Sequence, residues 1–169
     1  MALPAKLQDL FTNGKVPQAE RHNRVLGATE TGEIFSTLTD SEQAKQVLEL
    51  LLRGPTTEGL VGTIPPTTRL REIYLSPEGT AFADFSRDLA DKHGGGSHAE
   101  IATIYSIIDS LAYNVPRIRR VQILLDGHEV HTLAGHIGLW LPLVPEYDFV
   151  DRTPTKAAPA RPAEKRTNI

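Results

Sequence analysis

The stretch Arg69-Leu70-Arg71-Glu72-Ile73-Tyr74-Leu75-Ser76-Pro77-Glu78-Gly79-Thr80-Ala81-Phe82-Ala83-Asp84-Phe85 decides the fold of this chain. Pro77-Glu78-Gly79 is typical of a tight turn, because proline fixes one backbone angle and glycine adopts conformations that other residues avoid. Thr80–Phe85 alternates small and large side chains, as a strand does. The pattern predicts a β-hairpin made of Arg69–Leu75 and Thr80–Phe85.

The residues after this hairpin predict a helix. Ser97-His98-Ala99-Glu100 has the spacing of a capping box, in which the serine and glutamate side chains bond free backbone amides. Asn114-Val115-Pro116 ends the helix, because the residue before proline avoids the helical conformation. Apolar residues recur between these limits on one helical face: Ile101, Ile104, Tyr105, Ile108, Leu111 and Ala112.

Two more strands are predicted beyond this helix. Val121, Ile123 and Leu125 alternate along one strand, and Asp126-Gly127 then turns the chain into a short strand over Glu129–Leu133. The segment Trp140–Phe149 is rich in apolar residues and prolines. We expect it to form a strap packed against the sheet or an exposed docking peptide.

The residues before the hairpin predict a first helix and an N-terminal hairpin. Thr39-Asp40-Ser41-Glu42 is a second capping-box pattern, and Gly54-Pro55 ends that helix. Its buried face is expected to hold Ala44, Val47, Leu48 and Leu51. Glu33–Leu38 is predicted to be a strand, with Asn23–Ala28 as its hairpin partner around a turn at Thr29–Gly32. Ala5–Phe11 is predicted to form a short helix.

The order of these elements predicts an α+β fold, with two helices packed on one face of a mixed three- or four-stranded sheet. We assign the folded domain to residues 23–150. Residues 1–22 are expected to be a flexible segment or to hold the one short helix. Residues 151–169 are expected to be a disordered tail rich in proline and alanine, because they contain almost no large apolar side chain.

Composition excludes several classes of function. The 169 residues include 18 Lys+Arg and 21 Asp+Glu, and this balance argues against a nucleic-acid-binding protein. The chain has no cysteine, which excludes disulfides, thiolate zinc sites and iron–sulfur clusters. No apolar run approaches the ~20 residues that a membrane span needs. Residues 1–11 contain no apolar core of the kind found in signal peptides.

Four stretches, in this order, resemble the GerMN domain family of sporulation and spore germination proteins. They are Leu51–Thr56 with Glu58-Gly59-Leu60, Ile64–Leu70, Gly79–Ser86, and Val121–Gly127 running on to Thr132–His136. The resemblance covers about residues 23–143 in a single copy. It implies a domain without catalytic activity, placed outside the cytoplasmic membrane in the bacterial cell envelope, and similar to the ring-building motifs of secretion-system proteins.

A glycine-rich loop is a candidate ligand site, made of Lys92, His93, Gly94, Gly95, Gly96 and Ser97. A helix that begins after such a loop can bind an anion with its free amides. The loop lacks the Gly-x-x-x-x-Gly-Lys-Ser/Thr pattern of nucleotide-binding loops. The alternative is a flexible hinge whose serine caps the helix.

A candidate interaction surface follows from the alternation of the strands. If Ala81, Ala83 and Phe85 face the helices, Phe82 faces outward, and Leu124 and Tyr74 join it on the open face of the sheet. An apolar patch rimmed by charge is typical of a protein contact. The alternative is that the N-terminal segment or the tail covers this face.

The six histidines do not predict a metal site, because His128 and His131 are three apart on a strand and point to opposite faces. Gly135 and His136 match the family pattern Leu-Ala-Gly-His, and we expect His136 to make a structural hydrogen bond in a turn. No Gly-x-Ser-x-Gly elbow is present, no motif singles out a pair of carboxylates, and no cofactor is implied.

The sequence therefore predicts a non-catalytic interaction or scaffold domain of the bacterial cell envelope, acting by assembly with itself or with another envelope protein. The alternative is a module that binds a small ligand or anion at the glycine-rich helix start. Neither nucleic acid nor a membrane span is expected to take part.

Overall fold

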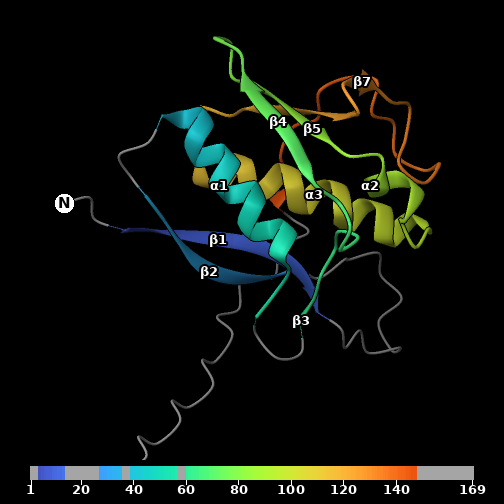
Figure 1. Ribbon diagram of the computed structural model, residues 1–169, viewed down its shortest axis with the longest axis horizontal. Coiled ribbons are helices and arrows are strands. Elements are labelled where there is room, and N and C mark those ends of the chain that lie inside the picture. Colours follow the sequence, from blue (N-terminus) through green and yellow to red (C-terminus); the bar gives the residue numbers. More distant parts are fainter. Residues whose placement is uncertain (1–3, 14–26, 36–38, 57–59, 148–169) are drawn as a thin grey trace, which may run out of the picture.

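The computed structural model describes residues 4–13, 27–35, 39–56 and 60–147, which form two sheets with helices between them (Figure 1). The three-stranded sheet has the order β2-β1-β3 and the four-stranded sheet has the order β4-β5-β6-β7. The strands are β1 (Pro4–Asn13), β2 (Gly27–Phe35), β3 (Leu60–Val61), β4 (Leu70–Leu75), β5 (Thr80–Phe85), β6 (Arg120–Leu125) and β7 (His128–Glu129). The helices are α1 (Asp40–Arg53), α2 (Asp88–Asp91) and α3 (Ser97–Asn114).

The four-stranded sheet is mixed. β5 pairs with β4 in antiparallel fashion and with β6 in parallel fashion, and β6 pairs with β7 in antiparallel fashion. A parallel pair needs a crossover connection, and α3 supplies it between β5 and β6. The predicted α+β class and the mixed sheet with packed helices are therefore confirmed.

The main core lies between the helices and the four-stranded sheet. Its sheet side consists of alternate residues of β5 and β6, as the sequence predicted, and its helix side consists of one apolar face each of α1 and α3. These side chains are at most 1% exposed: Ala81, Ala83, Phe85, Val121, Ile123 and Leu125 from the strands, and Ala44, Val47, Leu48, Leu51, Ile104, Ile107, Ile108 and Leu111 from the helices.

The predicted start and end of α1 are confirmed. The Thr39 hydroxyl accepts a hydrogen bond from Glu42 N (3.3 Å), and Glu42 Oε2 accepts one from Thr39 N (2.9 Å). Gly54 ends the helix with a φ of +79°, a conformation that glycine adopts at little cost. Local signals alone therefore determine where this helix begins and ends.

Thr39→Ala is expected to lower the free energy of unfolding by about 1 kcal/mol, because it removes one half of the capping box. Ser97→Ala is the matched control. Ser97 lies inside α3, and the N-cap residue of that helix, Gly96, makes no side-chain capping hydrogen bond. We expect the control to change stability by less than about 0.5 kcal/mol in urea unfolding. Equal losses in the two variants would contradict this assignment of the caps.

Residues 33–35 lie in a strand as predicted, and residues 36–38 lie outside the described residues, but the other N-terminal predictions are wrong. Ala5–Phe11 lies within the strand β1, and Thr29–Gly32 is the middle of the strand β2 instead of a turn. The two strands pair along nine residues, from Pro4 with Phe35 to Thr12 with Gly27. This pairing satisfies the backbone groups that a helix would have satisfied internally. It also adds a second sheet, which lies on the other side of the helices from β4–β7 (Figure 1).

The start of α3 is capped differently from the prediction, and the last strand, β7, ends earlier. α3 starts after Gly96, and Glu100 turns its carboxylate away from Ser97, so the predicted capping box at this helix is wrong. β7 stops at Glu129, and further on the backbone amides of Leu133, Ala134 and His136 bond the Glu100 carboxylate instead of β6. The division of the chain at residues 22 and 150 stays a prediction, and residues 151–169 lie outside the described part.

Candidate functional site

The face of the four-stranded sheet that points away from the helices carries an aromatic pair. Tyr74 and Phe82 are directly opposite each other on β4 and β5, and their ring centroids are 6.3 Å apart. Tyr74 is 61% exposed, whereas its neighbour Ile73 is buried in the core. Phe82 is half-buried, so the pair presents mainly the Tyr74 ring to solvent.

Leu124 lies on the same face but beside charged groups. It is half-buried and lies opposite Asp84. Arg71 bridges this part of the face, with Nε 3.1 Å from Asp84 Oδ2 and Nη1 3.0 Å from Asp126 Oδ1. The structure thus brings Tyr74 and Phe82 together and puts Leu124 at the charged rim.

A strap formed by residues 137–147 borders the aromatic pair. Leu143 exchanges two backbone hydrogen bonds with Val121 (2.8 and 2.9 Å), and Gln122 Nε2 donates to Leu139 O (2.6 Å). Because Gln122 lies opposite Phe82, the strap meets the sheet next to the aromatic pair. Trp140, Leu141 and Val144 are 59%, 65% and 59% exposed. The segment therefore packs as a strap and still presents apolar side chains to solvent.

The glycine-rich loop is held by His93. Nδ1 of this ring accepts from Gly95 N (3.1 Å), and Nε2 lies 3.0 Å from Thr103 Oγ1. Nδ1 is therefore unprotonated, and Nε2 carries the proton that Thr103 accepts. Lys92 and the glycines are exposed. Anion binding here stays a prediction, and the Glu100 carboxylate in the first turn of α3 opposes it electrostatically.

The strongest polar contact of this region belongs to Glu100, which sequence reasoning assigned only to a cap. Glu100 is 0% exposed and accepts hydrogen bonds from Leu133 N, Ala134 N and His136 N at 2.8 to 3.0 Å. His136 Nδ1 lies 3.0 Å from the same carboxylate. The structure thus places His136 in a turn that is bound to the start of α3.

Two opposing effects act on the pKa of Glu100. Burial is the larger single effect and raises the pKa, but the hydrogen bonds from Ala134, His136 and Leu133 together outweigh it. The net result is a pKa below the ordinary value, so Glu100 is ionised at neutral pH. An ionised carboxylate with several amide donors is a rigid anchor for the turn.

A second buried carboxylate, Asp109, lies further along α3. It is 1% exposed, and its Oδ1 accepts a hydrogen bond from Glu146 N of the strap (2.8 Å). Burial raises the pKa of Asp109 to about 6, and the Glu146 charge adds to the increase while the amide hydrogen bond opposes it. Burial, together with the charges of Asp109 and Glu146, also raises the pKa of Tyr105.

Asp109→Asn is expected to stabilise the protein at pH 7 by about 1–3 kcal/mol, because the buried site favours an uncharged group and the amide oxygen still accepts from Glu146 N. Between pH 4 and pH 6 the native protein keeps a proton that the unfolded chain has lost. Stability of the parent protein therefore falls as the pH rises through this range. Urea unfolding from pH 4 to pH 8 measures both curves, and parallel curves would contradict the prediction.

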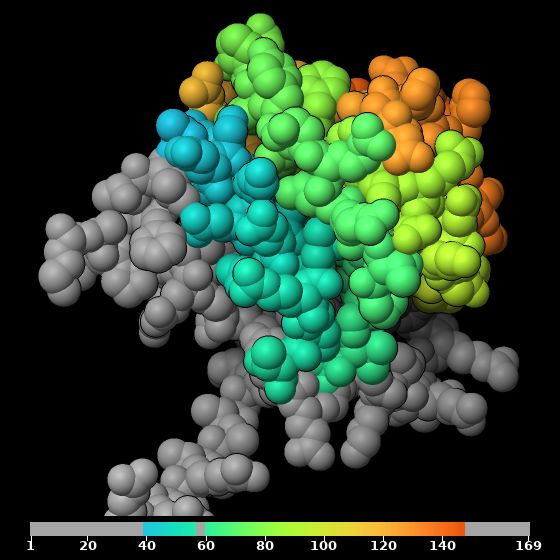
Figure 2. Space-filling view, viewed as in Figure 1, coloured from blue at the N-terminus to red at the C-terminus, as the bar shows by residue number. Residues whose placement is uncertain are grey.

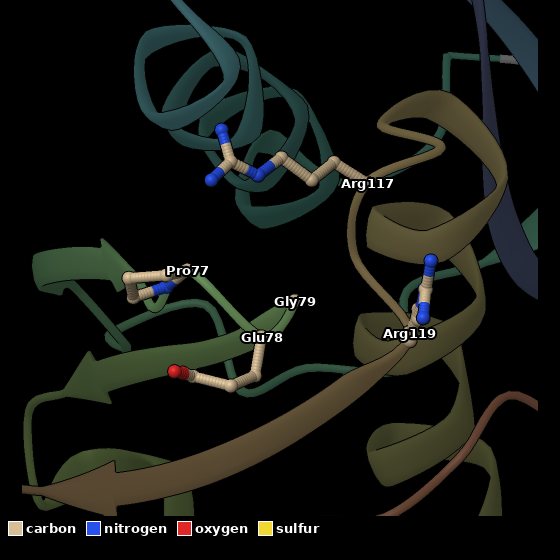
Figure 3. Close-up of a pocket in the computed structure, with 5 residues that line it drawn as sticks. All are labelled: Pro77, Glu78, Gly79, Arg117 and Arg119. Atoms are coloured by element: carbon tan, nitrogen blue, oxygen red, sulfur yellow. The ribbon is translucent and has the colours of Figure 1, made fainter.

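A pocket of about 230 Å³ lies at the turn between β4 and β5, lined by Pro77, Glu78, Gly79, Arg117 and Arg119. Arg117 Nη1 lies 3.5 Å from Asp40 Oδ2 at the start of α1. Figure 3 shows the Arg117 side chain reaching toward that helix, while Arg119 and Glu78 point in other directions. The charged groups do not converge on one point, so this pocket is a poor binding site for a small anion.

Within the described residues, His, Cys, Asp and Glu side chains nowhere gather in a group of three or more that could hold a metal ion. None of the described helices combines the length and the apolar character that crossing a membrane requires.

Comparison with known proteins gives the fold a family. The model of the Germane family, described as sporulation and spore germination, matches residues 12–131, which is more than half of the chain. No curated protein sequence matches the chain. Three solved structures, each below 25% identity, share the fold.

The first is a protein designated a lipoprotein from Clostridium perfringens, with 23% identity, a TM-score of 0.59, and coverage of 87% of this chain and 93% of that chain. The second is the tandem GerMN domains of the sporulation protein GerM from Bacillus subtilis, with 22% identity and a TM-score of 0.57. The match covers 85% of this chain but only 46% of the tandem-domain chain. The first GerMN domain of GerM alone gives 21% identity, a TM-score of 0.55, and coverage of 88% and 98%.

These matches confirm the resemblance to GerMN domains that the four sequence stretches indicated. One copy of the domain accounts for the whole described fold, since it spans about half of the tandem structure and nearly all of the single domain. The chain belongs to the Germane family of sporulation and spore germination domains.

Proposed function

We propose that this chain is a non-catalytic interaction domain of the bacterial cell envelope that binds another copy of itself or a second envelope protein through the outer face of its four-stranded sheet. The observation that carries the proposal is the contact between the exposed Tyr74 ring and the half-buried Phe82 ring on this face. Aromatic residues at the centre of an apolar patch supply much of the binding energy in protein contacts. The envelope location is supported by relatives that include a lipoprotein and the sporulation protein GerM.

The strap adds apolar side chains next to the same surface. Trp140 and Leu141 follow directly after Leu139, whose carbonyl bonds Gln122 in the row of Tyr74 and Phe82. The ion pairs of Arg71 with Asp84 and Asp126 give the patch a charged rim beside Leu124. An apolar centre with a polar rim is the usual composition of an interface.

Tyr74 is suited to a direct test because Tyr113, at the end of α3, is a matched control. The two tyrosines are 61% and 57% exposed. A photo-crosslinking phenylalanine analogue at position 74 is expected to give one adduct of defined mass in living cells, with itself or with one envelope protein. The same analogue at position 113 is expected to give none. Adducts at neither position, or at both equally, would contradict the proposal.

Substitution should give the same contrast in solution. Tyr74→Asp is expected to weaken the association of the purified chain with itself or with the captured partner at least tenfold, while Tyr113→Asp leaves it unchanged. Analytical ultracentrifugation or a pull-down with the identified partner measures the change. Thermal unfolding of both variants checks that each remains folded.

A further inference from the structure

A shallow groove of about 370 Å³ lies between the last turn of α1 and the start of β4, away from the aromatic pair. Figure 2 shows the two segments side by side on one face, α1 in blue-green and the residues leading into β4 in green. The groove joins cationic, apolar and hydroxyl-bearing side chains with one acidic one: Glu49, Leu52, Arg53, Thr68, Arg69 and Leu70.

Two guanidinium groups line this groove without an ion-pair partner among the described residues, Arg53 from α1 and Arg69 from the strand entry. The backbone of Arg69 is fixed, because its N donates to Ser86 Oγ (3.0 Å) and its O accepts from Ser86 N (2.8 Å). Arginine side chains bind carboxylates with paired hydrogen bonds. The groove therefore offers two exposed cationic donors, against Glu49 as the one acid among its lining residues.

Thr68 gives an independent sign of a missing ligand. Its side chain is 6% exposed, and Oγ1 is the one buried side-chain polar atom of the described residues that has no hydrogen-bond partner. A buried hydroxyl without a partner is rare, because it has lost its bond to water. Oγ1 is closed to solvent, so an oxygen atom of a bound anion supplies this partner only when the Thr68 side chain shifts toward the groove.

We infer that this groove binds a carboxylate attached to a short apolar chain, such as an acidic residue beside an apolar one in a peptide. The carboxylate lies between Arg53 and Arg69, next to Thr68. The apolar chain packs on Leu52 and Leu70, which are partly buried at the edge of the core. This site is separate from the sheet face of the proposed function and does not depend on it.

Sodium hexanoate is the simplest probe of this chemistry. In a ¹H–¹⁵N NMR titration we expect saturable shifts at the amides of Arg53, Arg69 and Leu70, with a millimolar dissociation constant. Hexylamine has the same chain with the opposite charge and is expected to leave these amides unshifted. Inorganic phosphate lacks the chain and is expected to bind at least fivefold more weakly. Phosphate binding as tight as hexanoate binding would overturn the assignment of the ligand class.

Charge variants identify the residues that bind the probe. Arg53→Gln and Arg69→Gln are each expected to raise the dissociation constant at least fivefold, whereas Glu49→Gln lowers it. Arg119→Gln, a change of the same kind in the other pocket, is the control and should have no effect. Tyr74→Asp should also leave hexanoate binding unchanged, so that failure of this site and failure of the sheet interface are distinguishable.

Thr68→Val separates a binding role from a structural one. Valine keeps the shape of threonine and removes the hydroxyl that has no partner, so the ligand-free variant is expected to unfold at a higher temperature than the parent chain. The same variant is expected to bind hexanoate at least twofold more weakly. Absence of saturable shifts in the parent chain, or unchanged binding in both arginine variants, would overturn the proposal.

Discussion

Glu100→Ala is expected to lower the free energy of unfolding by about 4 kcal/mol, because it leaves three backbone amides of the turn without an acceptor inside the protein. Those amides belong to Leu133, Ala134 and His136, and Glu100 itself is fully buried. Urea unfolding monitored by circular dichroism gives the difference. The fluorescence of Trp140 reports separately on the strap that follows the turn.

His136→Ala is the control for this prediction. The His136 side chain is 47% exposed and makes one of the four bonds to Glu100, while its backbone amide remains in the variant. We expect this control to cost about 1 kcal/mol or less. Similar losses for Glu100→Ala and His136→Ala would show that the ring, and not the set of amides, holds the turn.

Glu100 also makes the stability of the protein fall at acid pH. Its pKa is lowered in the folded protein, so its contribution is complete above the ordinary pKa of a glutamate and is lost as the pH falls toward the folded value. Glu100→Gln removes this dependence and presents an amide group to amide donors. We expect it to cost about 2–3 kcal/mol at pH 7 and less at pH 3. A loss that does not vary with pH would contradict an ionised Glu100.

Gly79→Ala is the second substitution with a large expected effect, about 3–4 kcal/mol of lost stability. A Cβ atom at this position would lie 2.5 Å from the Arg117 carbonyl oxygen, which is too close for two atoms without a bond. The Gly79 carbonyl also accepts hydrogen bonds from Arg119 N (2.8 Å) and Arg120 N (3.3 Å). A shift of Gly79 would therefore disturb the start of β6 as well as the hairpin turn.

Gly95→Ala isolates the steric part of this loss. The two glycines have similar φ angles, +85° at Gly79 and +76° at Gly95, but apart from its chain neighbours no heavy atom would lie within 4 Å of a Cβ at Gly95. Only the backbone strain remains there, which costs about 1–2 kcal/mol. Thermal and urea unfolding of both variants measure the difference. Equal losses would mean that the contact with Arg117 relaxes without cost.

Comparison of the two expected capping boxes shows what a local pattern can predict. Thr39 and Glu42 form the box because nothing else competes for their side chains. Ser97 and Glu100 have the same spacing, yet Glu100 binds amides more than thirty residues later in the chain. The competing partner is distant in sequence, so the local pattern gave the right helix and the wrong cap.

The prediction for the N-terminal strands was wrong for a related reason. Leu7, Leu10 and Phe11 have helical spacing, but the segment pairs with β2, whose residues lie 15 to 31 positions later in the chain. Strand pairing is non-local, and tertiary contacts override weak helix propensity. The hairpin Arg69–Phe85 was predictable because its two strands are adjacent in sequence and the residues between them are typical of a tight turn.

The candidate sites were partly predictable. Strand alternation was enough to place Tyr74 and Phe82 on one face, while Gln122 on that face is 2% exposed because the strap covers it. The groove at Arg53 and Arg69 had no signal in the sequence. A helix end and a strand start meet there only in the folded chain.

The edges of the four-stranded sheet limit how copies of this domain can join. The outer edge of β6 is occupied by β7 at one end and by Leu143 at the other. Within the described residues, no strand pairs with the outer edge of β4. A contact made by joining two β4 edges uses the same surface on both copies, so it is two-fold symmetric and closes as a dimer. A ring or filament would need a second, different surface on each copy.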